Sequence, residues 1–363
     1  MSLRERQGKR QGKHHRSVRR FVHVLFGLCV GTALASATAA AEDVASFYKS
    51  HKLTMGAPSN AGGSYDAYMR LLARHIARFI PGEPSTVVQN VGAGGGMVLA
   101  NQIYNTSPKD GSTIGMVRGT VVQEHVFENP QAKFDGRKFE WLGNMKFDYD
   151  TCIVSAASGI KTIKDFYTHE VVVGASGVGA QAYSFPIVYR DLLGMKFKVI
   201  AGYPGTPERL LAMERGEIAG ACGITTTSFR TVAGSAAAEG KVILVAQAGS
   251  RSDPAFPDTP NILDEAKTPD VRAALEFLFA PLALGRPLAA PPGTPKDRVA
   301  ALGKAVVATM RDREFLADAD KAQIDIEVSD GAETAKIVDS FYKAPKDVVK
   351  RVQTALQAAG GTP

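Results

Sequence analysis

The chain has 363 residues, of which 45% are hydrophobic and 22% charged, a balance typical of a folded protein with a large core. This length predicts two domains. The formal net charge is +7, but the first 41 residues contain eight basic residues against Glu5, and this excess accounts for the whole of it. The remaining chain carries no net charge and no basic run, which excludes a general nucleic-acid-binding surface.

Residues 1–41 have the pattern of a secretion signal, in which a basic segment precedes an apolar run over 21–35 and a stretch of small residues. The run is shorter than the ~20 residues that a membrane-spanning helix needs, although an anchor is the alternative interpretation. We therefore predict an exported, periplasmic protein. Cleavage is expected after Ala41, with Ala39 and Ala37 as alternatives.

Loss of this leader removes Cys29 and leaves Cys152 and Cys222. In an oxidising compartment these two cysteines either pair or remain buried thiols, and the residues alone leave both possibilities open. The four histidines outside the leader are scattered, and no cysteine–histidine spacing indicates a metal. We predict neither a metal nor a cofactor.

From residue 53 onward, short apolar or β-branched runs alternate with helical patterns, which predicts an α/β fold built from parallel βα units. The first helix is expected over 64–79, where apolar residues recur at three- and four-residue spacing, and Pro81 and Gly82 end it. Breaks in the chain are expected around 147–151 and near 279–285. Strand-to-turn segments follow in this order: 86–89, 112–117, 171–179, 197–200 and 242–246.

Several of these strands end in glycine-bearing polar turns, such as AGGSYD, NVGAGGG and ASGVG. Because ligands of open α/β sheets bind at the carboxyl ends of strands, we expect these turns to meet at one cleft. A helix that begins at such a turn exposes amides without intrahelical partners, and its dipole favours an anion. AGGSYD lacks the lysine of a nucleotide-binding loop, so it suits a carboxylate. The alternative is that the glycines only permit tight turns and close packing.

Two catalytic interpretations have weaker motifs. Gly177-x-Gly179 lies between a strand and a helix, as in a dinucleotide site, but the strand that follows ends without the acid that would bind a ribose. Ser158 and Lys161 match one acyl-enzyme motif, yet its companion motifs are missing. We therefore predict a protein that is not an enzyme, with an exported NAD(P)-dependent oxidoreductase that uses the Gly177/Gly179 loop as the alternative.

Six segments resemble the extracytoplasmic solute receptors of tripartite tricarboxylate transporters, also called Bug receptors, in order and over nearly the whole mature chain. They read APSNAGGSYDAYMRLLARHI, QNVGAGGGMVLANQIY, PKDGSTIGMV, GYPGTPERLLAMERGEIAG, RSDPAFPDTPNILDEA and APPGTPKDRVAALGKAV. The resemblance implies an α/β, type II-like periplasmic-binding-protein fold of two domains, each a mixed sheet flanked by helices, with a ligand cleft between them. With the two breaks above, domain 1 is expected over 42–149 and 280–363, and domain 2 over 150–279.

The resemblance also implies a function. Such a receptor is a periplasmic monomer that closes on a small carboxylate and delivers it to a transporter made of a large and a small integral membrane subunit. A sensor subunit that presents the same ligand to a signalling partner is an alternative.

Site residues follow from matching positions. The resemblance places one carboxylate at a first-domain group, in which Asp66 is expected to cap the helix because its charge repels an anion. This group comprises Ser59, Gly62, Gly63, Ser64, Asp66, Asn90, Ala93 and Gly94. The distal part of the ligand is expected at Ser176, Gly177, Gly179, Gln181, Tyr183, Tyr203, Pro204 and Gly205.

The chain departs from the family where the ligand is selected. A run of serines and a histidine that is common in the family is replaced by Ala-Gln-Ala-Tyr over 180–183, which predicts a ligand whose far end is less charged or bulkier. The NVGAGG turn lacks the usual arginine, so Arg118 is expected either as a bidentate carboxylate partner or in a surface salt bridge. Cys152 lies near the predicted crossover into domain 2, and Cys222 lies where the family has a strand near the hinge. We predict that the two form a disulfide that braces domain 2.

Overall fold

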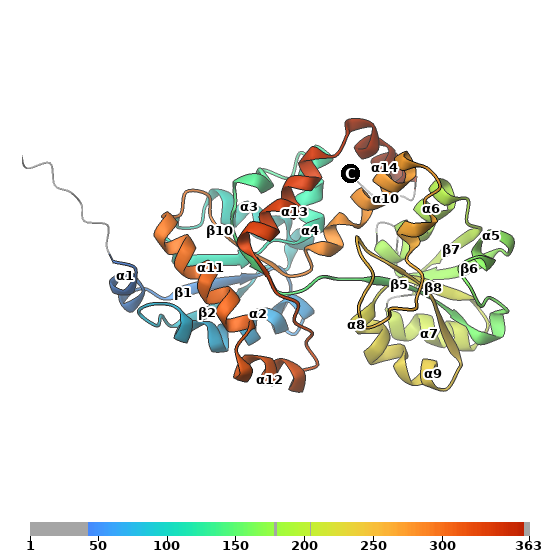
Figure 1. Cartoon of the computed structure of the whole chain (residues 1–363), viewed down its shortest axis with the longest axis horizontal. Helices are drawn as coiled ribbons and strands as arrows, with labels where there is room; N and C mark the ends of the chain where they lie inside the picture. The colour runs from blue at the N-terminus through green and yellow to red at the C-terminus, as the bar shows by residue number, and fades with distance from the viewer. Residues whose placement is uncertain (1–42, 178–179, 204, 359–363) are drawn as a thin grey trace, which may run out of the picture. The chain divides into compact units, whose positions relative to one another are not determined.

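The computed structural model describes residues 43–177, 180–203 and 205–358, and its strands form two sheets (Figure 1). The predicted leader over 1–41 lies outside the described residues. Within the described part of the chain, no helix has both the length and the apolar character that crossing a bilayer requires.

The first sheet has six strands in the order β11-β4-β10-β3-β1-β2. β1 pairs in parallel with β2 and β3, whereas β10 runs antiparallel between β3 and β4, and β11 pairs antiparallel with β4. The chain therefore forms β1 to β4, builds the second sheet, and returns to insert β10. The strands are β1 Leu53–Ala57, β2 Thr86–Asn90, β3 Thr113–Met116, β4 Glu140–Asn144, β10 Pro287–Ala290 and β11 Ser329–Asp330.

The second sheet has five strands in the order β7-β6-β8-β5-β9. β6 pairs in parallel with β7 and β8, and β5 lies antiparallel to both β8 and β9. Both sheets are thus mixed, which confirms the mixed sheets that the family resemblance implies. The parallel pairs join β1 with β2 and β3, and β6 with β7 and β8, whereas the pairs made by β4, β5, β9, β10 and β11 are antiparallel. The strands are β5 Asp150–Ser155, β6 Val171–Ala175, β7 Phe197–Ala201, β8 Gly220–Thr225 and β9 Val242–Ala248.

Local chemistry sets many helix boundaries. Thr268 caps α10 and Pro269 occupies its first position, where a missing N–H costs nothing. Asp330 and Glu333 form a capping box at the start of α13. Gly194 ends α6 in the left-handed region at φ 78°. The α-helices are α1 Val44–Ser50, α2 Ser64–His75, α3 Met97–Asn105, α4 Gly119–Val126, α5 Asp165–Thr168, α6 Gln181–Leu193, α7 Thr206–Glu214, α8 Thr226–Ser228, α9 Gly234–Ala238, α10 Pro269–Phe279, α11 Lys296–Met310, α12 Arg313–Lys321, α13 Gly331–Lys343 and α14 Lys346–Ala358.

The helix expected over 64–79 is divided in two. Its α-helical part, α2, ends at His75, and a 3-10 turn, Ile76–Phe79, completes it before Pro81 and Gly82. Short 3-10 turns are common at helix ends because the tighter winding satisfies the last carbonyl groups. Each of the five strand-to-turn segments expected from the sequence contains a strand.

In the described part of the chain, apolar side chains form three buried clusters. The largest contains side chains from helices that pack beside either sheet, including Leu99 of α3, Phe185 of α6 and Phe341 of α13. It also holds Cys152 and Cys222, whose sulfur atoms form a disulfide between the neighbouring strands β5 and β8. The two smaller clusters pack on one sheet each.

The predicted domain boundaries stay a prediction, because residues 44–363 group as one unit. Helix α14, which the prediction assigns to domain 1, packs against α6 and α10. Helix α10, which lies between β9 and β10 and which the prediction assigns to domain 2, therefore contacts the C-terminal helix α14.

Candidate functional site

A cavity of about 720 Å³ is lined by residues that belong to both sheets. The segments that adjoin the first sheet are the first turn of α2, the turn before α3 and the start of α4. The residues that adjoin the second sheet are Gln181 of α6, Thr225 of β8 and Ser228 of α8. The segment 281–286 before β10 completes the lining. Such a concave meeting point of helix starts and strand ends is where α/β proteins bind small ligands.

The loop before α2 is held by its own polar groups. The Gly62 N–H donates to Asp66 Oδ2 at 2.8 Å, and the Asp66 N–H donates to Ser59 Oγ at 3.1 Å. The Gly63 N–H donates to the Asn60 carbonyl at 3.1 Å. These amides are therefore engaged within the loop. The N–H groups of Ser64 and Tyr65, the first two residues of α2, have no acceptor within the helix, and both residues line the cavity.

Asp66 is buried beneath this loop and organises it. Its Oδ1 accepts from Asn90 Nδ2 at 2.8 Å and pairs with Arg70 at the same distance. Burial raises the pKa of the Asp66 carboxyl, but the hydrogen bonds from Arg70, Gly62 and Asn90 outweigh burial, and the net shift is downward. The helix cap itself is Gly63, which has no side chain to accept a bond. Asp66 thus acts from the first turn of the helix, by accepting a hydrogen bond from the Gly62 amide.

The second glycine turn approaches the cavity with left-handed backbone. Gly94 and Gly95 have φ values of 60° and 62°, which favour glycine, and both line the cavity. Arg118 lies across this turn, donating from Nη1 to the Gly95 carbonyl at 3.0 Å, with its guanidinium 4.5 Å from the centre of the Tyr65 ring. Among the described residues no carboxylate pairs with Arg118, so the expected surface salt bridge is not formed there.

Arg286 is a cavity residue that the sequence analysis missed. It is 8% exposed, and its guanidinium lies 4.3 Å from the centre of the Tyr65 ring. Nη2 donates to Ser64 Oγ at 2.6 Å and Nη1 donates to Asp148 Oδ2 at 3.0 Å, whereas the buried Nε has no partner among the described residues. Burial lowers the pKa of Arg286, but the Asp148 carboxylate together with Tyr65 and Tyr68 outweighs burial, and the net shift is upward. Arg286 therefore remains a cation at the start of α2.

The structure brings together some of the predicted site residues and separates others. Five of them line the cavity: Ser59, Ser64, Gly94, Arg118 and Gln181. Two lie outside the described residues: Gly179 and Pro204. The rest are not among its lining residues: Gly62, Gly63, Asp66, Asn90, Ala93, Ser176, Gly177, Tyr183, Tyr203 and Gly205.

Tyr65, Gly95 and Met97 lie in or beside the two glycine turns and were also missed. Other missed lining residues come from segments that contain no glycine-rich turn. Asp148 lies on the connection between the sheets, Glu124 lies on α4, and Thr225 and Ser228 are the last residues of β8 and α8. A signal was present for Arg286, which is a single charged residue in the otherwise apolar stretch PLALGRPLAAPP. A charged side chain in such a stretch is rarely buried without a partner or a role.

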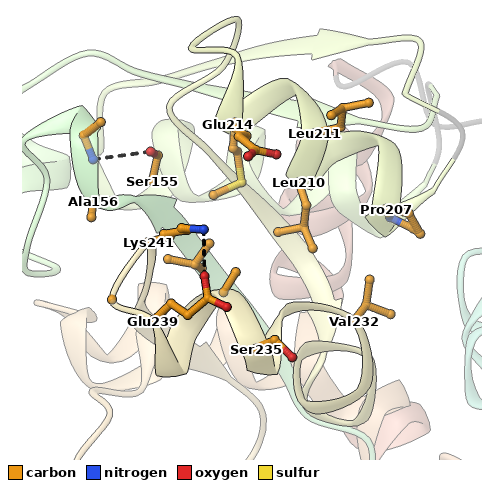
Figure 2. A pocket seen from close by; sticks show the side chains of 15 residues that line it. Ser155, Ala156, Pro207, Leu210, Leu211, Glu214, Val232, Ser235, Glu239 and Lys241 are labelled. Carbon is orange, nitrogen blue, oxygen red and sulfur yellow. Dashed lines mark hydrogen bonds and ion pairs between the residues drawn. The ribbon is translucent and has the colours of Figure 1, made fainter.

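A second cavity, of about 740 Å³, lies between α7 and α9 (Figure 2). Apolar side chains, among them Leu210, Leu211 and Val232, form much of its wall. Its charged residues are Glu214, Glu239 and Lys241, and Lys241 already pairs with Glu239 at 2.7 Å. This groove offers an acid no uncompensated cation, so the cavity at α2 is the better candidate for an anionic ligand.

Among the residues that the structure describes, one cluster of metal-ligand type lies away from the cavity. His75, Asp312 and Glu314 bring potential ligand atoms within 4.8 Å of one another. Arg78 pairs with both carboxylates, and His75 Nε2 pairs with Asp318 at 3.0 Å. These ion pairs account for the cluster without a metal.

Comparison with known protein families identifies the family of this chain. The model of the tripartite tricarboxylate transporter family receptor, TctC, matches residues 69–354. The chain belongs to this family. TctC proteins are solute-binding receptors. The match covers the second sheet, the first sheet apart from β1, and the cavity lining apart from Ser59, Ser64 and Tyr65. Comparison with curated proteins gave no match.

Solved structures show the same two-sheet α/β fold. A TctC solute-binding protein from Polaromonas, without ligand, has a TM-score of 0.68 at 17% identity, covering 85% of this chain and 99% of that one. MatC from Rhodopseudomonas palustris with bound malate has a TM-score of 0.54 at 21% identity, covering 83% and 99%. An R. palustris protein with adipate has a TM-score of 0.57 at 15% identity, covering 86% and 99%. The periplasmic-binding-protein fold predicted from the sequence is confirmed.

Proposed function

We propose that this TctC-family protein is an exported receptor that binds a small organic acid in the cavity at the start of α2 and delivers it to a tripartite tricarboxylate-type transporter. The observation that carries the proposal is the convergence of two arginines, two serine hydroxyls and a helix N-terminus on one cavity.

The chemistry of this end of the cavity suits a carboxylate. The first amides of α2 supply N–H donors, and the helix dipole adds a favourable potential. Ser59 and Ser64 supply hydroxyl donors, and Arg118 supplies a guanidinium that lacks an ion-pair partner among the described residues. Charge-assisted bonds of this kind are about twice as strong as neutral ones. The Arg286 charge is offset by Asp148, so its role is to hold the Ser64 hydroxyl in place.

Export and delivery follow from the family and from the leader. Residues 1–41 have the order of a secretion signal, which agrees with the periplasmic location of TctC receptors. The partner is then a pair of integral membrane subunits, because a receptor of this family captures a solute for transport. Two relatives of the same fold carry the dicarboxylic acids malate and adipate.

A thermal-shift screen of the mature chain against mono-, di- and tricarboxylic acids, with nucleotides and NADH as controls, tests the proposal. A ligand at 100 times its Kd stabilises the folded state by about 2.7 kcal/mol, which a melting curve detects. We expect at least one acid, and no nucleotide, to raise the melting temperature. A nucleotide response without an acid response would favour the oxidoreductase alternative.

A further inference from the structure

The cavity at α2 continues into a smaller crevice. A space of about 230 Å³ shares four lining residues with the larger cavity: Thr120, Glu124, Gln181 and Pro281. Beyond these four, apolar side chains form most of the crevice wall, namely Phe127, Phe185, Leu278 and Leu356. A ligand anchored at α2 therefore has an apolar space beyond its far end.

Helices fix the walls of this crevice. Gln123 Nε2 donates to the Phe277 carbonyl at 2.8 Å, which joins α4 to α10. Gln353 Nε2 donates to the Phe127 carbonyl at 3.1 Å, which joins α14 to the end of α4. The rings of Phe127 and Phe277 pack edge to face with centroids 5.7 Å apart. The crevice is thus a feature of packed helices and not of a loop.

The junction between the two spaces carries a negative charge. The Glu124 side chain lines both spaces, and its Oε2 accepts a hydrogen bond from Asn129 Nδ2 at 2.8 Å. Arg118 and Arg286 line only the larger cavity, and Glu124 is the charged residue in the crevice lining. A second carboxylate on the ligand would meet Glu124 without a cation to compensate it, and like charges at close range disfavour binding.

We propose that the site selects an acid with a single carboxylate and an apolar tail, aliphatic or aromatic, which passes between Glu124 and Gln181 into the crevice. This inference rests on the proposed function and specifies its substrate class. The carboxylate occupies the end near Ser64 and Arg118, and the tail is buried against Phe127, Phe185 and Leu278. Each buried methylene increases affinity roughly fourfold.

Isothermal titration of the mature chain with hexanoate and adipate tests the inference, because these acids differ only in the group at the far end. We expect hexanoate to bind at least about tenfold more tightly than adipate, and 3-phenylpropanoate to bind more tightly than propanoate. Equal or tighter binding of adipate would overturn the inference.

Two variants locate the effect. Glu124→Gln should shift the hexanoate-to-adipate preference toward adipate by about tenfold, because it removes the repulsion. Leu356→Trp should fill the crevice and weaken the binding of hexanoate by about tenfold or more. The affinity for propanoate should stay within about threefold of the wild-type value. Gln357→Trp, which places the same ring at the exposed neighbouring position on α14, is the matched control.

The outcomes separate this inference from the proposed function. If propanoate and adipate bind but tail length and Leu356→Trp have no effect, the tail inference fails and acid binding stands. If no acid binds to a chain whose melting curve is cooperative, the proposed function fails as well. An unchanged acid preference in Glu124→Gln would remove the role given to the junction.

Discussion

At the scale of single residues, the candidate site is built from side chains with different tasks. Asp66 and Asn90 hold the first loop from beneath, whereas Ser59, Ser64 and Arg118 line the cavity. The glycines of AGGSYD therefore serve the turn, and the residues that follow them serve the cavity. Of the two arginines that line the cavity, Arg118 is the one without a carboxylate partner among the described residues, because Arg286 pairs with Asp148.

Replacing Arg118 by Gln should weaken acid binding by about 10- to 100-fold, the equivalent of one charge-assisted hydrogen bond. The free energy of unfolding without ligand should fall by only about 1 kcal/mol, because the half-buried side chain forms no ion pair among the described residues and loses one hydrogen bond, to the Gly95 carbonyl. Isothermal titration measures the loss. Arg74→Gln, on an exposed position of α2, is the matched control and should bind as the wild type does. Wild-type affinity in Arg118→Gln would show that the guanidinium takes no part.

Asp150 gives a prediction on pH. Its side chain is buried, and neither carboxylate oxygen has a hydrogen-bond partner among the described residues. Burial and the nearby Asp148 charge raise the pKa of Asp150 to about 7, and the Arg209 charge opposes this shift. The unfolded chain releases this proton near pH 4. The folded protein therefore binds more protons between about pH 4 and pH 7, and its stability should fall as the pH rises through that range.

The variant Asp150→Asn tests this sign. This variant should lose the pH-dependent component of stability. Its free energy of unfolding, relative to that of the wild type, should therefore rise by about 1–4 kcal/mol as the pH increases from 5 to 8. Urea unfolding at each pH measures the difference. The exposed substitution Asp320→Asn should follow the wild-type profile. Parallel profiles for Asp150→Asn and wild type would contradict the assignment.

At the scale of elements, the positions of strands and turns could be predicted from the sequence, but the segments that pack against them could not. The strand–turn–helix pattern located α2 and the turn before α3, and the family resemblance assigned Ser59, Ser64 and Gly94 to these segments. Arg286 contacts Ser64 across 222 residues of chain, because β10 inserts between β3 and β4 after the second sheet is complete. Periodicity reports which residues face a core and not which distant segment lies opposite. Asp148, Glu124 and Leu278 were missed for the same reason.

The disulfide between β5 and β8 belongs to this scale. Cys152 and Cys222 are 70 residues apart and directly paired in register. Replacing both by Ala should lower the free energy of unfolding by about 2–5 kcal/mol, because the unfolded chain regains the freedom of the closed loop. Urea unfolding measures this loss. Thiol titration of denatured, unreduced mature chain should find no free thiol, and two free thiols would contradict the disulfide.

At the scale of the whole molecule, polar contacts link the segment before β11 to residues around the second sheet. Asp325 pairs with the buried Lys146 and with Arg230, and it accepts a hydrogen bond from Thr227 at 2.9 Å. Arg251 pairs with Glu327 at 2.9 Å. The cavity at α2 also draws its lining from both sheets, so a ligand there would contact both parts of the chain. This arrangement suits a receptor whose ligand stabilises one relative position of the two sheets.

The central claim is that an acid binds at the start of α2. A crystal structure of the mature chain with its tightest-binding acid tests this claim directly. We predict a carboxylate at the amides of Ser64 and Tyr65 and at the Arg118 guanidinium, with the rest of the ligand directed past Gln181. An acid found instead in the groove between α7 and α9, with the cavity at α2 filled only by solvent, would contradict it.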